Sequence, residues 1–576
     1  MVPTVRPFRK TDLDSAENRA FLRTQLIAYI GNKRALLPFL ADVFSAIAER
    51  HSVRRFLDPF AGTGSVSRLA KVLGYEVGAS DWEFYSWIVN LCHVECDRSQ
   101  LANLFGRTGG IERTIDSLNR EGDVGPAYVS RHYAPSSTES ADYRVERLFY
   151  TRENALFIDR VRNRIEEIYP GWELDPVRRL EKAILVSLLI YQAAKHANTS
   201  GVFKAYHKGF GGHGGDALSR ILAPMRLCIP VLVDGKFGCT SSRRNALSFV
   251  SGRPADIAYL DPPYNVHQYG SNYFMLNTIA MWDRPEVPGD RDEKGRLREK
   301  AGIRRDWTET RSAYCSRKTA SVELKSLMDT IDARYIVMSY SSEGIIPFEE
   351  LLDLLSYHGR VELYGRDYTV YRGGRQSMSR QTGNVEFVLV VERGPASTGA
   401  VDRRFQRFKL ERDIGMLLRR SFVPARLANA FVKKGMTVYL DQTLGGDGFE
   451  TELLYRFRPM SAETAARLKT LLAGKSIEQL TDIRQRLLAA AASTTGEEAG
   501  VLLSLLCDTP ELSRRAFYVR RLLVVMRKFA NRKYRDQFVD FSRRLRDAIA
   551  RQPDRFPGIA GPLDELEALF SRRLAG

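Results

Sequence analysis

The sequence predicts an α/β domain that carries a helical insertion and is followed by a mostly α-helical domain. Short strand-like apolar runs alternate with helical apolar spacing over residues 35–81, which is the pattern of βαβ units. This rhythm stops over residues 97–236 and resumes at residue 255. Beyond residue 461, Ala, Leu and Arg recur with helical periodicity, which predicts the second, helical domain.

The first elements follow one another with short loops. Residues 1–20 are polar, and we expect them to be loose. Residues 35–50 have the spacing of a helix, and a strand ends at Phe56-Leu57. A second helix is predicted from Ser65 to Leu73, and a second strand from Glu76 to Ala79.

The later elements complete the same domain after the insertion. Strand patterns occupy residues 255–260, 334–340, 361–372 and 385–392, with a helix pattern at 347–357. We therefore expect one α/β domain built from residues 21–96 and 237–393, with residues 97–236 inserted. Small and polar residues at 394–400 predict a linker, and residues 401–576 form the basic, mostly helical domain.

The charge of the chain points to a polyanionic partner. The 576 residues carry a formal net charge of +18, of which residues 396–576 contribute +12. Nucleic acid is the commonest partner of so basic a protein. The last third of the chain is therefore a candidate binding region.

Targeting and metal signals are absent from the sequence. The N-terminal residues have no apolar signal core, and the longest apolar run, Ala183 to Ala194, is too short to span a membrane. We expect a cytoplasmic protein without membrane contact. Cys92, His93 and Cys96 lack a second ligand pair at zinc-site spacing, so we expect no metal.

A glycine-rich turn follows the first predicted strand. The segment Asp58-Pro59-Phe60-Ala61-Gly62-Thr63-Gly64 stands at that strand's carboxyl end, where ligands bind in open α/β sheets. Its two glycines let the backbone approach a small ligand closely. Asp58 can meet an ammonium group, and Asp81, after the second strand, is placed for ribose hydroxyls. These features indicate a site for S-adenosylmethionine (SAM).

An acidic tetrapeptide follows a later apolar strand. Asp261-Pro262-Pro263-Tyr264 comes directly after Ile257-Ala258-Tyr259-Leu260. A carboxylate and the Pro262 carbonyl can accept the two N–H groups of an exocyclic amine, and the prolines fix the backbone that carries them. Tyr264 can stack on a base. The chemistry predicted for these four residues is methyl transfer to an amine on a flat ring.

Three motifs in this order resemble the Dam-type, alpha-group DNA adenine-N6 methyltransferases. They are Tyr29-Ile30-Gly31-Asn32-Lys33, Phe60-Ala61-Gly62-Thr63-Gly64 and Asp261-Pro262-Pro263-Tyr264. The resemblance covers roughly residues 21–393 and implies a Rossmann-like SAM-dependent methyltransferase sheet, with the insertion as target-recognition region. It also implies that Tyr29, Lys33 and Phe60 line the SAM pocket. Asn245 stands where the family often has an acid that touches the donor's adenine.

Two regions are candidates for contact with double-stranded DNA. In the insertion, Lys195, Asn198, Thr199 and Lys204 belong to a stretch of small polar and basic residues, which suits phosphate and base-edge contact. In the last domain, the basic residues Arg520, Arg521, Arg527 and Lys528 are interleaved with aromatic residues. This pattern suits contact with the DNA backbone.

Two other functions stay open at this point. Some RNA base amine methyltransferases carry the same acidic tetrapeptide, although in them it usually follows the glycine motif within one short domain. A SAM-binding DNA-specificity subunit without its own activity is the second alternative. By resemblance to its family, the chain serves a restriction-modification or defence system and has a partner protein there.

Overall fold

The computed structural model describes residues 13, 15–28, 30–211, 217–365, 386–394, 400–418, 420, 422–434, 437–440, 448–450, 462–508 and 515–575. The described residues separate into two compact units that divide near residue 401. We describe each unit by itself. The domain limits expected from the sequence stay predictions.

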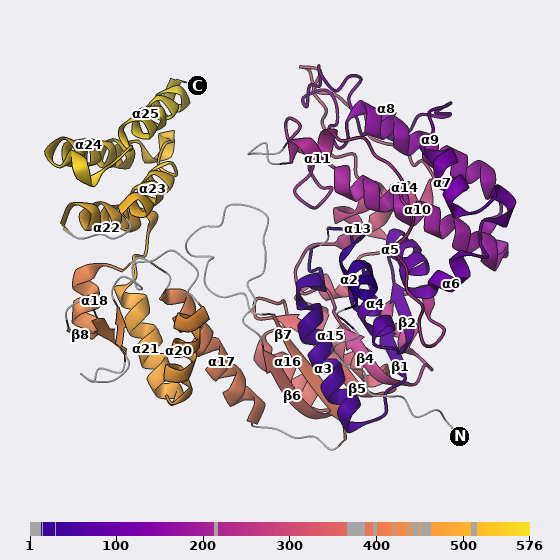
Figure 1. The fold of residues 1–576 in the computed structure, drawn as a ribbon, viewed down its shortest axis with the longest axis horizontal. Helices are drawn as coiled ribbons and strands as arrows, with labels where there is room; N and C mark the ends of the chain where they lie inside the picture. Colours follow the sequence, from indigo (N-terminus) through magenta and orange to yellow (C-terminus); the bar gives the residue numbers. More distant parts are fainter. Residues whose placement is uncertain are drawn as a thin grey trace. The chain divides into compact units, whose positions relative to one another are not determined.

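A seven-stranded sheet is the centre of the first unit (Figure 1). Its strands lie in the order β3-β2-β1-β4-β5-β7-β6, and β7 is antiparallel to both of its neighbours while the other pairs are parallel. The strands are β1 (Arg55–Asp58), β2 (Glu76–Asp81), β3 (Thr240–Arg243), β4 (Ala255–Leu260), β5 (Ala333–Ser341), β6 (Gly359–Gly365) and β7 (Glu386–Arg393). The α/β fold class predicted from the sequence is confirmed.

The two sequence motifs end neighbouring strands of this sheet. β1 pairs with β4 in parallel, with Phe56 opposite Ile257 and Leu57 opposite Ala258. The chain leaves β1 toward β2 on one side, while β4 lies on the other, so the strand order reverses at this point. Ligands of open α/β sheets bind at such a switch point, beyond the carboxyl ends of the strands.

Helices cover the sheet on both faces (Figure 1). One core packs Phe44, Phe56, Leu69 and Tyr259 between the strands and the helices α3 and α4. The helices around the sheet are α2 (Ala16–Arg23), α3 (Leu37–Arg50), α4 (Ser65–Val72), α5 (Phe84–Asn90), α12 (Ala246–Val250), α15 (Ala320–Thr330) and α16 (Phe348–Ser356).

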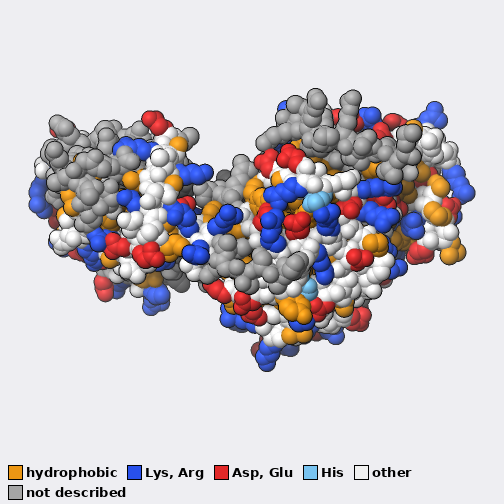
Figure 2. Space-filling model, turned by 90° about the horizontal axis from the view of Figure 1, so that it is seen from below, with side chains coloured by type: hydrophobic (Ala, Val, Ile, Leu, Met, Phe, Trp, Pro, Cys, Tyr) orange, Lys and Arg blue, Asp and Glu red, His pale blue; other side chains and the backbone are white. Residues whose placement is uncertain are grey.

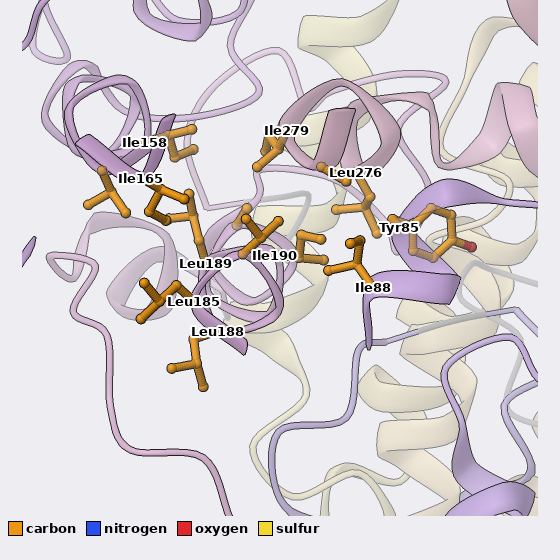
Figure 3. Close-up of a cluster of buried hydrophobic side chains, with 14 of the residues drawn as sticks. Tyr85, Ile88, Ile158, Ile165, Leu185, Leu188, Leu189, Ile190, Leu276 and Ile279 are labelled. Carbon is orange, nitrogen blue, oxygen red and sulfur yellow. The ribbon is translucent and has the colours of Figure 1, made fainter. Parts of the chain in front are cut away.

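The inserted region is helical, but its core is shared with elements outside it. Figure 3 shows side chains of α10 between Ile158 and Ile165 of α9 on one side and Tyr85 and Ile88 of α5 on the other, with Leu276 and Ile279 of α14 in the same cluster. The helices of this layer are α6 (Arg98–Leu101), α7 (Ile111–Asn119), α8 (Val129–His132), α9 (Arg152–Ile168), α10 (Pro176–His196), α11 (Leu218–Leu222), α13 (Tyr269–Asn272) and α14 (Phe274–Met281). The segment after the acidic tetrapeptide thus completes the helical layer.

The second unit has two small cores and a short antiparallel sheet of order β10-β9-β8. One core is built around Leu417, Leu427 and Leu487, and the other around Leu522, Phe538 and Leu563. Its elements are α17 (Ala400–Leu417), α18 (Pro424–Ala430), β8 (Val432–Lys434), β9 (Thr437–Tyr439), β10 (Gly448–Glu450), α20 (Ala462–Ala473), α21 (Ile477–Ala490), α22 (Thr495–Asp508), α23 (Arg515–Met526), α24 (Arg535–Arg551) and α25 (Ala560–Ala575). In the described part of the chain, no helix has the length and apolar character needed to cross a membrane.

Candidate active site

One open cavity lies at the carboxyl ends of β1, β2 and β4 and encloses about 1240 Å³ of space, part of which is open solvent. The wall is formed by residues 30–33, 58–63, 81–83, 244–246, 261–264 and 310–314, with further side chains between them. Both sequence motifs therefore face the same space.

The glycine turn after β1 is held from behind by α5. Gly62 and Gly64 have φ angles of +52° and +76°, a region that residues with a Cβ rarely adopt. The Gly62 carbonyl accepts hydrogen bonds from Ser86 Oγ at 2.5 Å and Asn90 Nδ2 at 3.2 Å. A Cβ at Gly64 would lie 2.5 Å from Asn90 Oδ1, so only glycine fits there.

Asp81 joins the turn to β2. The N–H of Gly62 donates to Asp81 Oδ2 at 2.8 Å, and the N–H of Glu83 donates to Oδ1 at 2.9 Å. Burial raises the pKa of Asp81, and these two N–H groups oppose that shift. The carboxyl thus fixes the turn while it lines the cavity.

Asp58 is a buried carboxyl at the end of β1, with 1% of its surface exposed. Ser67 Oγ donates to its Oδ2 at 2.6 Å, while no described side chain donates to its buried Oδ1. Burial raises the pKa of Asp58 to about 7. A cationic ligand group beside this carboxyl would supply the missing partner.

The Ile30–Lys33 segment is anchored by two tyrosines from beyond the acidic tetrapeptide. Ile30 N–H donates to Tyr273 Oη at 2.7 Å, and Tyr269 Oη donates to the Ile30 carbonyl at 3.4 Å. Lys33 is 3% exposed, and its Nζ donates to the Gly31 carbonyl at 3.0 Å. These contacts fix the position of the ammonium group.

One oxygen of the Asp261 carboxylate forms both an ion pair and a hydrogen bond. Lys33 Nζ lies 2.9 Å from Asp261 Oδ1, and Ser339 Oγ donates to the same oxygen at 3.0 Å. Tyr259 Oη lies 2.8 Å from Ser339 Oγ and is the donor there, because Ser339 donates onward. Burial raises the pKa of Asp261, and Lys33 opposes the shift. Burial acts against the charge of Lys33 as well, but Asp261, Tyr264 and Glu386 together outweigh it and raise the pKa of Lys33.

Tyr264 is held by a residue on the antiparallel strand β7. Its Oη donates to Glu386 Oε1 at 3.2 Å, and Tyr340 packs edge-on against its ring at 5.9 Å. The Lys33 ammonium lies 5.4 Å from the centre of the ring. Burial raises the pKa of Tyr264, so the phenol stays protonated and remains a donor.

Comparison with known proteins identifies the family. The family model of the D12 class N6 adenine-specific DNA methyltransferases matches residues 29–351. This range covers more than half of the chain and includes the glycine turn and the acidic tetrapeptide. The chain belongs to this D12 class.

Curated relatives of the D12-class chain are modification enzymes by name. The Type II methyltransferase M.NlaIII of Neisseria lactamica is 30% identical over 365 residues, which cover 62% of this chain and 96% of that relative. The modification methylase LlaI of Lactococcus lactis subsp. lactis is 30% identical over 369 residues, or 63% of this chain and 54% of LlaI. M.FokI of Planomicrobium okeanokoites is 28% identical, with 65% and 54% covered. This chain thus spans about half the length of LlaI and M.FokI, and no solved structure matches it.

One wall of the D12-class pocket comes from residues 310–314, which the sequence did not single out. Gln268 pairs with Ser312 twice: Oε1 accepts from the Ser312 N–H at 2.8 Å, and Nε2 donates to its carbonyl at 3.2 Å. Tyr314 packs edge-on against Phe60 at 5.2 Å. No periodicity marks this segment, and the pairing joins residues 44 apart in the chain, so the sequence carries no local signal for it.

Most residues singled out in the sequence meet in the pocket. Its wall includes Lys33, Asp58, Phe60, Gly62, Asp81, Asn245, Asp261, Pro262, Pro263 and Tyr264. Gly64 closes the same turn, while Tyr29 lies outside the described residues. Asn245 accepts from the Ser248 N–H at 2.8 Å and so caps α12, a use of its oxygen that an aspartate would share.

Two of the residues expected to contact DNA have partners within the protein itself. Asn198 is fully buried, and its amide donates to the carbonyls of Leu148, His207 and Gly209. Arg521 pairs at 2.8 Å with Glu498, which is itself fully buried. Both side chains therefore hold the protein's own structure together, because burying a polar group requires a partner inside the fold.

The remaining expected contacts are accessible. Thr199 is half-buried, and the exposed residues are Lys195, Lys204, Arg520, Arg527 and Lys528. Burial raises the pKa of Cys315 to about 11, and the charge of Lys204 opposes this shift, which puts Lys204 close to Cys315. Cys315 Sγ in turn lies 3.4 Å from the His267 carbonyl, just after the acidic tetrapeptide. Lys204 is therefore within electrostatic range of the loop that follows the acidic tetrapeptide.

On the face of the molecule drawn in Figure 2, Lys and Arg side chains are interspersed with Asp and Glu. Among the described residues, no group of three or more His, Cys, Asp or Glu side chains is arranged to hold a metal ion.

Proposed function

We propose that this chain is a site-specific DNA adenine-N6 methyltransferase of the Dam-type alpha group, which transfers a methyl group from SAM to an adenine flipped out of the duplex. One observation carries the proposal. The glycine turn of β1 and the Asp261–Tyr264 tetrapeptide of β4 open into a single cavity. A donor held by the first would face an acceptor held by the second.

The residues present fit SAM. The ligand is cationic at its sulfonium and at its ammonium group, and the turn offers the buried carboxyl of Asp58 with an oxygen that no described side chain satisfies. Asp81 stands one strand further on, in the position that takes ribose hydroxyls in dinucleotide folds. When bound, SAM supplies an electrophilic methyl group, so the protein needs no covalent nucleophile.

We assign the binding of SAM to residues around the turn. Gly62 and Gly64 allow close backbone approach, Asp58 pairs with the ammonium group, and Asp81 binds the ribose. Phe60 supplies an apolar wall that Tyr314 braces. Tyr29 and Asn245 complete the assignment, the latter through its amide group.

We assign catalysis to the acidic tetrapeptide. The lone pair of adenine N6 is delocalised into the ring, so the nitrogen becomes a nucleophile only when its N–H bonds are drawn out of the ring plane. The carboxylate of Asp261 accepts one N–H and the Pro262 carbonyl accepts the other, while Pro263 keeps the backbone rigid. Tyr264 stacks on the base. Alignment and preorganised charge then provide most of the acceleration.

Lys33 lines the pocket, as expected from the sequence, and also contacts the acidic tetrapeptide. Its ammonium contacts Asp261 directly at 2.9 Å. We propose that Lys33 is a positioning residue that keeps the catalytic carboxylate ionised and oriented. An ionised carboxylate can only accept hydrogen bonds, which is what the N6 amine requires.

The target adenine must first be flipped out of the DNA base stack, which costs about a few kcal/mol. Lys195, Thr199 and Lys204 are the candidates for contact with the DNA beside the pocket, since Lys204 is within electrostatic range of the loop that follows Tyr264. The relative LlaI is named a modification methylase. We therefore propose that it acts in a restriction-modification or defence system with a partner nuclease.

The test is methyl transfer from labelled SAM to duplex DNA, single-stranded DNA and RNA in parallel. We expect duplex DNA to accept the label at adenine N6, and long-read sequencing of DNA from expressing cells to reveal one recognition site. Asp261→Ala should lose at least about 1,000-fold in rate, equivalent to about 4 kcal/mol, while it keeps its affinity for SAM. Turnover retained in this variant, or preferential labelling of RNA, would overturn the proposal.

A further inference from the structure

Five basic residues on the second unit form an exposed segment between α23 and α24. They are Arg527, Lys528, Arg532, Lys533 and Arg535, all exposed, and no acidic residue stands among them. We call residues 527–535 the basic segment. The family match ends at residue 351, so it assigns nothing to this part of the chain.

The charges of the basic segment have no partners among the described residues. None of its five cations forms an ion pair with a described residue. The next three arginines along the chain do form ion pairs. The paired groups are Arg543 with Asp540 and Asp547, Arg544 with Asp540, and Arg546 with Asp564 and Glu567. The unit therefore neutralises one set of basic residues and leaves the other set open to solvent.

Internal contacts hold the basic segment in one conformation. Phe529 and Ala530 are buried in the core, and Arg573 donates to the Ala530 carbonyl at 2.9 Å. Asn531 donates to the Lys528 carbonyl at 2.8 Å and accepts from the Lys533 N–H at 3.1 Å. The cations are thus presented from a fixed backbone, and a rigid surface loses less entropy when it binds.

An aromatic ring lies among the cations. Tyr534 is 37% exposed, packs edge-on against Phe529 at 5.6 Å, and has the Lys533 ammonium 5.2 Å from its centre. Uncompensated cations with a polar aromatic ring suit a sugar–phosphate backbone, where contacts come from Arg, Lys and Tyr side chains.

We propose that the basic segment binds the phosphate backbone of double-stranded DNA as a second contact surface, separate from the catalytic pocket. The choice of DNA rests on the proposed function of the first unit, while the polyanion chemistry rests on the segment alone. Such a contact carries no sequence information and acts by counterion release. It would raise affinity for any duplex without altering the choice of adenine.

The strength of this binding is measurable as a salt dependence. For duplex DNA, the slope of log K against log salt becomes shallower by about 0.9 for each phosphate that the protein no longer neutralises. We would measure binding of the full-length protein to a fluorescent duplex by anisotropy between about 50 and 200 mM salt. Arg532→Gln with Lys533→Gln should reduce the magnitude of the slope by about 1.8.

A matched variant in the same unit supplies the control. Arg543→Gln with Arg544→Gln removes the same charge, but from arginines that pair with Asp540. We expect its slope to change by less than about 0.5, because these charges are already compensated. Thermal unfolding of both variants checks that the unit stays folded, and replacing all five cations by Gln extends the series if two give too small a change.

Three outcomes would overturn the inference. They are an unchanged slope when all five cations are removed, equal slope changes in the paired and unpaired variants, and a greater effect of the substitutions on RNA binding than on duplex binding. The assay involves no methyl transfer. A DNA-binding effect without methylation of any DNA would therefore reject the proposed function and retain this inference, while normal methylation with an unchanged slope would do the reverse.

Discussion

The two halves of the pocket are built in different ways. The glycine turn is fixed by backbone geometry, since Gly62 and Gly64 have positive φ angles and Asn90 fills the space behind them. The Asp261 half is fixed by charge, through Lys33 at 2.9 Å and Ser339 at 3.0 Å. Steric changes should therefore disrupt the first half, and protonation should disrupt the second. Variants of the first half should lose SAM binding, whereas variants of the second should lose turnover.

Steric change at Gly64 should give the largest effect on SAM binding. A non-glycine residue at φ +76° costs about 1–2 kcal/mol, and its Cβ would lie 2.5 Å from Asn90 Oδ1, so either the turn or the Asn90 side chain that holds it must move. We expect Gly64→Ala to weaken SAM binding by about 100-fold or more, measured by calorimetry, because both penalties add.

Gly74 provides the control for this substitution. It has a φ of +81°, but a Cβ there would meet only Lys236, at 3.6 Å or more. Gly74→Ala should therefore share the backbone strain and lose stability without losing affinity for SAM. Equal loss of SAM affinity in the two variants would show that strain alone, and not the geometry of the turn, controls binding.

Removal of the Lys33 charge should act on turnover. Lys33 opposes the burial that raises the pKa of Asp261, and loss of an opposite charge at this distance shifts a pKa by about 1–3 units. The ionised carboxylate is the active form, so activity falls as pH drops through this pKa. In the Lys33→Met variant, the acidic limb of the pH profile of the single-turnover rate should move upward by about 1–3 pH units. The rate should recover at high pH.

Lys33→Arg tests whether charge is the cause. It keeps the positive group, so the limb should move much less, although the geometry of the contact changes. A pH profile that is the same in the Met variant and the unaltered protein would contradict the charge-based account of this half.

The sequence predicted the parts of the pocket that depend on neighbours along the chain. Both motifs directly follow strands, and Asp81 ends the next one, so their meeting at one edge of the sheet followed from the βαβ pattern. Glu386 and Ser339 could not be found in this way. They reach Tyr264 and Asp261 from strands 122 and 78 residues away, and neither stands in a recognisable motif.

Contacts within the protein engage two of the residues expected to contact DNA. Asn198 stands in a stretch of polar residues that resembles a surface loop, but the fold encloses it and uses its amide to join three carbonyls. Arg521 stands in a basic run, but Glu498 on α22 lies against it. A list of charges along the chain does not reveal which are already paired, and only the packing of α22 against α23 distinguishes them.

Protonation of Asp58 should also affect SAM binding in the half of the pocket built by the glycine turn. Burial raises the pKa of Asp58 to about 7, and the ionised form is the one that pairs with the ammonium group of SAM. Binding therefore has to release a proton when pH lies below this value. We expect affinity for SAM to be about 10-fold lower at pH 6 than at pH 8, with proton release visible by calorimetry in buffers of different ionisation enthalpy.

A second carboxyl makes a control necessary for this prediction. Burial raises the pKa of Glu83 to about 7 as well, and Glu83 lines the same cavity. Asp58→Asn should bind SAM more weakly at pH 8 and lose the pH dependence. If the dependence persists in this variant, Glu83 or Asp81 is its source, and the two halves differ less than we propose.

Tyr264 should give the smallest effect, because its ring and its hydroxyl serve different purposes. Tyr264→Phe keeps the stacking surface and removes only the bond to Glu386 Oε1, and one such hydrogen bond contributes about 0.5–1.5 kcal/mol. The rate should fall by about 2- to 10-fold with little change in the affinity for SAM. Tyr264→Ala removes the ring as well, and stacking is worth about 1–3 kcal/mol per base, so its loss should be larger and should appear in DNA binding. If Phe were as poor as Ala, the hydroxyl itself would take part in the reaction, and the charge-based half of the pocket would extend from Asp261 to the phenol.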